Sequence, residues 1–202
     1  LPSKDKQPYI VFVDENFCYR PDANILESKD TVLNFDLVGY YERLRKMFSN
    51  IEKWFKLPII VAASNKYQYP DSQNIFGERT LIYGQTLALI QNSYLILGFK
   101  SVALEQAIVS RKSLILLDDQ ALTKRNRDKQ QRDMIRIFRK ETIYMDKLSR
   151  NDIYEALNRE LDFYQNFEYM NLCEKGISKD YREICAEYFQ NFIEEHDSKN
   201  LA

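Results

Sequence analysis

The segment over residues 86–119 constrains the fold of this chain most strongly, because it reads as helix, strand, tight turn, helix and strand in close succession. The run at residues 94–97 (YLIL) is short and continuously apolar, which is typical of a parallel strand buried on both faces. Gly98 is predicted to stop this strand, and Ser101 is a good N-cap for a helix over residues 102–109. A second apolar run follows that helix and completes a predicted βαβ unit.

The turn after this strand is the first candidate binding site. The carboxyl ends of strands in open α/β sheets face a crevice, and the unpaired N–H groups of a following helix favour an anion there. Lys100 would add a positive charge at the turn, and Glu105, one helical turn beyond Ser101, would accept hydrogen bonds from sugar hydroxyls. A structural interpretation stays equally open, in which Ser101 only caps the helix, Lys100 is solvated and Glu105 stabilises the positive helix end.

The residues before this segment extend the same alternation. Apolar runs predict strands, and apolar residues at steps of one, three and four predict a long amphipathic helix. The predicted elements are a strand at residues 9–13, a helix at 35–56, a strand at 58–63 and a short strand at 79–83. Ser64 and Lys66 begin a polar and aromatic loop at the carboxyl end of the second strand. The order predicts an α/β fold, a Rossmann-like open parallel sheet flanked by helices on both faces.

The remainder of the chain changes character. Residues 120–140 are strongly basic, and we favour a solvated loop and helix over a surface for polyanions. The further expected elements are a short strand at 142–145, a helix capped by Ser149 or Asn151, and an aromatic helix at 179–194. We therefore predict a Rossmann-like domain over residues 1–147 and a C-terminal helical extension over residues 148–202 packed on it.

Composition excludes several classes of function. The 202 residues suffice for one domain with a helical appendage, and the net charge of −1 predicts no nucleic-acid partner. The single histidine, His196, argues against a Ser-His-Asp triad or a histidine metal site, and three widely spaced cysteines show no zinc spacing. No metal or cofactor is therefore predicted. Without an apolar membrane span or a signal-peptide pattern in the sequence, we expect a cytoplasmic protein.

Four segments between residues 9 and 119 carry a resemblance to a known family. They read YYERLRKMFSNIEKWF, PIIVAASNKYQYP, FGERTLIYGQT and TLALIQNSYLILGFKSVALEQAIVSRKSLILL. Together they resemble the C-terminal, nucleotide-sugar-binding half of GT-B glycosyltransferases and related bacterial surface-polysaccharide biosynthesis proteins. By position, Ser101 matches the Ser or Thr of the family's turn, and Glu105 matches the acidic residue of its helix.

The chain departs from the family at two places. Many relatives have a His-Pro pair after the second strand, where this chain has Ser64 followed by asparagine. Many also have a histidine at the turn, where this chain has Gly98, phenylalanine and Lys100. Lys100 and Lys66 are candidates to supply the positive charge instead. The substrate-binding residues that the resemblance implies are Gly98, Lys100, Ser101, Glu105, Ser64 and Lys66.

The resemblance implies a glycosyltransferase-like domain that binds a nucleotide-activated sugar in capsular or lipopolysaccharide synthesis. Its implied partners are a nucleotide-sugar donor and a glycan acceptor. In the family a separate N-terminal domain holds the acceptor, so that domain is expected to be missing here. Peripheral association with the inner face of the membrane is an open alternative. Two other functions stay open: an epimerase of the UDP-N-acetylglucosamine 2-epimerase type, and a noncatalytic interaction or regulatory module assembling through its aromatic terminal helices.

Overall fold

The computed structural model describes residues 7–16, 36–65, 68–69, 74–120, 135 and 140–165. The chain divides into two compact units, Leu1–Asp162 and Phe163–Ala202. All elements below lie in the first unit, apart from the end of the last helix, α8 (Arg150–Gln165). The domain boundary expected at residue 147 stays a prediction, and the helix expected at residues 179–194 lies outside the described residues.

The described part of the chain forms a six-stranded sheet in which every neighbouring pair is parallel, in the order β3-β2-β1-β4-β5-β6. The strands are β1 (Ile10–Val13), β2 (Ile59–Ala63), β3 (Leu81–Tyr83), β4 (Leu95–Gly98), β5 (Leu114–Asp118) and β6 (Ile143–Tyr144). This is the strand order of a doubly wound, Rossmann-like sheet, and it confirms the predicted fold class.

The central strands are buried, as their continuous apolar runs predict. Every residue of β1, β4 and β5 is buried. The strand stops at Gly98 as predicted, since Gly98 is the last residue of β4 and pairs with Val13 on one side and Leu116 on the other. Tyr94, which was expected to begin the strand, lies just before it and is 47% exposed.

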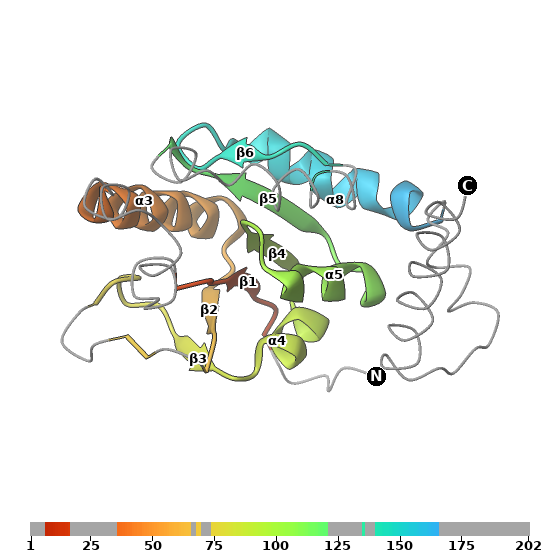
Figure 1. Ribbon diagram of the computed structural model, residues 1–202. Helices are drawn as coiled ribbons and strands as arrows, with labels where there is room; N and C mark the ends of the chain where they lie inside the picture. Colours follow the sequence, from red (N-terminus) through yellow and green to blue (C-terminus); the bar gives the residue numbers. More distant parts are fainter. Residues whose placement is uncertain are drawn as a thin grey trace, which may run out of the picture. The chain divides into compact units, whose positions relative to one another are not determined.

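Helices cover both faces of the sheet, as expected (Figure 1). One face packs against α3 (Leu37–Phe55), where the rings of Phe12 and Phe48 lie 5.1 Å apart between centroids, and Ile153 of α8 joins the same cluster. The other face packs against α4 (Thr86–Asn92), the 3-10 turn η1 (Val102–Leu104) and α5 (Glu105–Val109). None of the helices in the described residues is long and apolar enough to cross a bilayer.

Charged side chains fix α3 to the carboxyl edge of the sheet. The Arg43 guanidinium donates two hydrogen bonds to the Asp119 carboxylate, of 2.7 and 2.8 Å, and Asp119 follows β5 directly and is 2% exposed. The N-terminus of α3 is capped by Asp36, whose Oδ1 accepts the Gly39 N–H at 2.9 Å. These contacts set the helix against the same edge at which β1 ends.

Replacing Arg43 tests this attachment. The Arg43→Ala variant would leave the buried Asp119 carboxylate without its guanidinium, and we expect the free energy of unfolding to fall by about 3 kcal/mol. Urea unfolding at neutral pH measures this loss. Lys46→Ala, at an exposed position of the same helix, is the control and should change stability by less than about 0.5 kcal/mol. Equal stability of the two variants would contradict the role given to Arg43.

Candidate functional site

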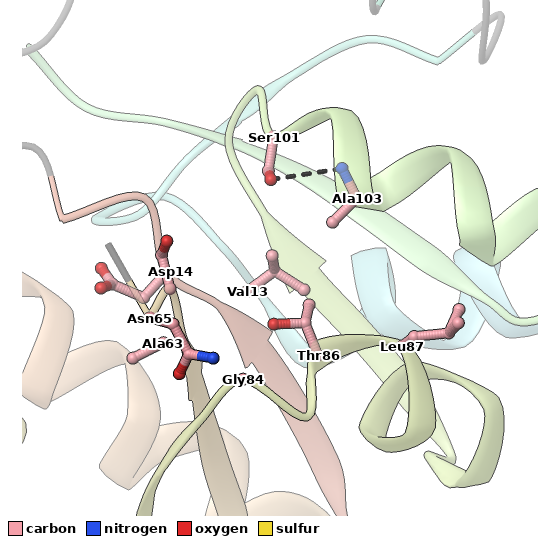
Figure 2. A pocket seen from close by; sticks show the side chains of 10 residues that line it. Val13, Asp14, Ala63, Asn65, Gly84, Thr86, Leu87, Ser101 and Ala103 are labelled. Atoms are coloured by element: carbon pink, nitrogen blue, oxygen red, sulfur yellow. Dashed lines mark hydrogen bonds between the residues drawn. The ribbon is translucent and has the colours of Figure 1, made fainter. Parts of the chain in front are cut away.

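A pocket of about 290 Å³ opens at the carboxyl edge of the sheet, where β1, β2 and β4 end (Figure 2). The residues that line it come from segments far apart in the sequence. The lining residues are Val13, Asp14, Ala63, Ser64, Asn65, Gly84, Thr86, Leu87, Ser101 and Ala103. They come from the ends of β1 and β2 and the residues that follow them, from the turn before α4 and the first residues of α4, and from Ser101 and η1.

The strand order explains the position of the pocket. β1 and β4 are neighbours in the sheet, but the chain leaves β1 towards α3 on one face and leaves β4 towards α5 on the other. Diverging connections leave a crevice between the two strand ends, which is where open α/β sheets bind ligands. Val13 and Gly98 are register partners at this point, so the residues that follow them stand on either side of the crevice.

The predicted site residues divide into three groups. Ser64 and Ser101 line the pocket. Gly98 ends β4 beneath it, whereas Lys100 and Glu105 are half-buried beside Ser101 and are absent from the lining. Lys66 lies outside the described residues. The structure therefore brings together the two hydroxyl residues of the prediction, and their part in binding stays a prediction.

Ser101 acts as the cap that the sequence predicts. Its Oγ accepts the Ala103 N–H at 3.3 Å, the contact drawn in Figure 2. The segment that it caps begins with a single 3-10 turn, and α5 adds only five residues, so a helix dipole contributes little charge here.

The two charged residues of the predicted turn have different surroundings. The main-chain N–H of Lys100 donates to the Glu15 carboxylate. Burial raises the pKa of the Glu105 carboxyl above its usual value.

Gly98 allows the turn to approach the sheet closely. A Cβ at this position would lie 2.6 Å from Cδ2 of Leu104, which is fully buried. The absent side chain therefore lets η1 pack directly against the end of β4. This contact sets the height of Ser101 above the sheet edge.

Gly84 has a comparable role on the opposite wall. Its φ of 68° lies in the left-handed region, and a Cβ there would lie 2.2 Å from Nδ2 of Asn65. The Gly84 N–H donates to the Ala63 carbonyl at 3.2 Å, which holds the turn against the end of β2. Only glycine combines this backbone with the Asn65 side chain in the pocket wall.

The residue that sequence analysis missed is Asp14, which follows β1 directly. It is 6% exposed, and its Oδ2 accepts hydrogen bonds from the Tyr69 hydroxyl at 2.6 Å and from the Asn16 N–H at 3.2 Å. Burial raises the pKa of the Asp14 carboxyl to about 6, although these hydrogen bonds oppose the shift. A polar residue immediately after a predicted buried strand was the available signal.

The lining is suited to the hydroxyl-rich part of a ligand. Ser64, Thr86 and Ser101 contribute hydroxyl groups, Asn65 contributes an amide, and Asp14 contributes a carboxyl group. Among the described residues that line the pocket, none is basic. In the described ranges, no group of three or more His, Cys, Asp or Glu residues is placed to hold a metal ion.

Comparison with known proteins gives only distant similarities. No protein-family model matches the sequence, and no curated protein matches it. The glycosyltransferase SnogD from Streptomyces nogalater aligns with a TM-score of 0.45 at 8% identity, over 82% of this chain and 41% of that one. The spinosyn forosaminyltransferase SpnP aligns with a TM-score of 0.35 at 13% identity, over 78% and 36%. The chain thus spans less than half the length of either structure, and scores this low do not establish a family.

The raised pKa of Asp14 makes a prediction about stability. Because the folded pKa of about 6 exceeds the ordinary 3.8, the folded state holds an extra proton between these values, and stability falls as pH rises through this window. We expect Asp14→Asn to raise the free energy of unfolding at pH 7.5 by about 1–3 kcal/mol and to have no such effect below about pH 4. Urea unfolding at both pH values measures this.

Asp36→Asn is the matched control. The Gly39 N–H and then Arg43 hold the pKa of the Asp36 carboxyl below its usual value, so this substitution should lower stability at neutral pH. The same change from Asp to Asn would then raise the free energy of unfolding at position 14 and lower it at position 36. An Asp14→Asn variant that is less stable than the parent at pH 7.5 would show that burial does not dominate at Asp14.

Proposed function

We propose that this chain is a glycosyltransferase-like domain that binds a nucleotide-activated sugar at the carboxyl edge of its sheet. The observation that supports it most is the pocket between the ends of β1 and β4, at the crevice of a doubly wound sheet. The hydroxyl and amide groups of its lining suit a ligand rich in hydroxyl groups. The resemblance in sequence covers the same turn, with Ser101 and Glu105 at the family's positions.

In this proposal one part of the ligand binds inside the pocket and another part binds at its margin. Ser64 and Ser101 contact it inside the pocket, while Lys100 and Glu105 lie beside Ser101 and reach it only at the margin. The Lys100 ammonium would stabilise the diphosphate as the glycosidic bond breaks, and Glu105 would accept ribose hydroxyls. The acceptor glycan would bind on a separate domain, as in the GT-B family, within surface-polysaccharide synthesis.

Calorimetry with UDP-, CDP-, GDP- and CMP-linked sugars tests the turn. We expect one class to bind, and Lys100→Ala and Glu105→Ala each to lose about 1–3 kcal/mol of binding free energy, because a charged hydrogen bond is removed. Unchanged binding in both variants would rule these two residues out of the site. No binding of any of the four classes to the parent chain would contradict the proposed function itself.

The pocket wall allows a second test with a matched pair of glycines. Gly84→Ala would strain a left-handed residue and displace Asn65, so we expect nucleotide-sugar binding to weaken roughly tenfold, from a lost hydrogen bond. Gly77 has a similar φ of 72°, but it is not among the lining residues. Gly77→Ala should therefore carry a similar strain and keep the affinity of the parent. Equal binding by both variants would contradict the position of the site.

The buried Asp14 also favours a second candidate, a nucleotide-sugar epimerase of the UDP-N-acetylglucosamine 2-epimerase type. Such an enzyme needs acid and base groups with pKa values near neutrality, and Asp14 is one such group. Incubation with the nucleotide sugar and no acceptor distinguishes the two candidates. An isomerised nucleotide sugar supports the epimerase, and release of product only when an acceptor and its domain are added supports the transferase.

A further inference from the structure

The pocket contains one carboxyl group whose surroundings differ from those of an ordinary surface aspartate. Asp14 lines the pocket at the end of the central strand, yet it is 94% buried, since only 6% of its surface is exposed. The described residues that share the lining with it are apolar or carry neutral hydroxyl and amide groups. A ligand that enters the pocket therefore meets an acceptor surrounded by neutral polar groups.

The hydrogen bonds of Asp14 orient it. The Tyr69 hydroxyl and the Asn16 N–H both donate to Oδ2, the first from the segment between β2 and β3 and the second from two residues beyond Asp14. Tyr69 is itself buried, and its ring packs edge-on against Phe76 with centroids 5.2 Å apart, so the phenol has little freedom. Burial and the Asp14 charge hold the pKa of the Tyr69 phenol above its usual value, which keeps it a neutral donor.

We propose that Asp14 binds the sugar portion of the nucleotide sugar by accepting hydrogen bonds from its hydroxyl groups, with Tyr69 as the positioning residue. This inference rests on the proposed function and assigns one part of the ligand to one end of the pocket. A carboxylate repels a diphosphate and forms strong hydrogen bonds with hydroxyl donors. The diphosphate then lies away from Asp14, towards the turn that carries Lys100.

Binding through an ionised Asp14 has a defined pH dependence. The pKa of Asp14 is raised to about 6, so its carboxylate is the main form above that pH and is lost as pH falls. The titratable groups around it in the described residues are Tyr69, Tyr41 of α3 behind Tyr69, and Glu15, which accepts the main-chain N–H of Lys100. The raised pKa of the Tyr69 phenol keeps it neutral in this range, and the Glu15→Gln variant below controls for Glu15.

The experiment measures affinity from pH 5 to pH 8 for the UDP-, CDP-, GDP- or CMP-linked sugar that binds, and for the same nucleotide without its sugar. The phosphodiester of a nucleotide sugar does not titrate in this range, whereas a terminal phosphate has a pKa near 6. The nucleotide alone is therefore compared only at pH 7.5. For the parent chain we expect affinity for the sugar-linked form to be about tenfold lower at pH 5 than at pH 7.5.

Two substitutions and one control show whether Asp14 causes the pH dependence of the affinity. Asp14→Asn should weaken the sugar-linked ligand roughly 10- to 100-fold at pH 7.5, remove the pH dependence and leave the nucleotide alone unweakened. Tyr69→Phe removes a hydrogen bond that lowers the pKa of Asp14, so the midpoint of the affinity profile should move to higher pH. Glu15→Gln should keep the midpoint of the parent.

Different outcomes would contradict the assignment of Asp14 and the proposed function itself. A nucleotide sugar that binds with equal affinity from pH 5 to pH 8, or that Asp14→Asn weakens no more than it weakens the nucleotide alone, overturns the assignment of Asp14 and retains the proposed function. A midpoint that moves with Glu15→Gln and stays fixed with Tyr69→Phe also overturns it. No binding by the parent chain at any pH overturns both.

Discussion

Parallel pairing of β1 with β2 on one side and with β4 on the other is the constraint on which the rest of this structure depends. A buried strand with two parallel neighbours needs a crossover to each of them, and right-handed crossovers place the helices on opposite faces. The carboxyl ends of β1 and β4 therefore lie side by side while the chain leaves them in opposite directions. The pocket, and the meeting of Asp14 with Ser101 in its lining, follow from this geometry.

Buried carboxyl groups at this edge are stabilised in different ways. Asp119 is paired with a guanidinium, a contact that attaches α3 to the end of β5. Asp14 instead receives a phenol and a main-chain N–H, which are neutral donors and leave the pKa of its carboxyl raised. The Arg43–Asp119 pair stabilises the fold, because breaking a buried ion pair leaves an uncompensated charge. The arrangement at Asp14 keeps a carboxyl group with a pKa near neutrality in a pocket, at a cost in stability that fits a ligand-binding role.

Sequence analysis predicted the fold well because its signals are local. The apolar runs gave all six strands close to their observed bounds, the spacing of Tyr41, Leu44 and Phe48 gave α3, and Ser101 caps the following turn as expected. The differences concern strand boundaries, which shift by one or two residues, as at Tyr94, which lies just before β4. Site prediction was less complete, since it named residues of two loops and omitted Asp14. Ser64 and Ser101 line the pocket, whereas Lys100 and Glu105 lie outside the lining and their part in binding stays a prediction.

The sequence by itself determined the alternation of strands and helices, the burial of the central strands and the candidate turn at Ser101, because periodicity and capping depend on neighbouring residues. Only the tertiary structure decided that Asp14 and Asn65 face Ser101 across one pocket, because strand order joins residues that are remote in the chain. It also decided the protonation of Asp14. Burial raises the pKa of that carboxyl and the hydrogen bond from Tyr69 lowers it. Both arise only when the sheet and its loops are packed together.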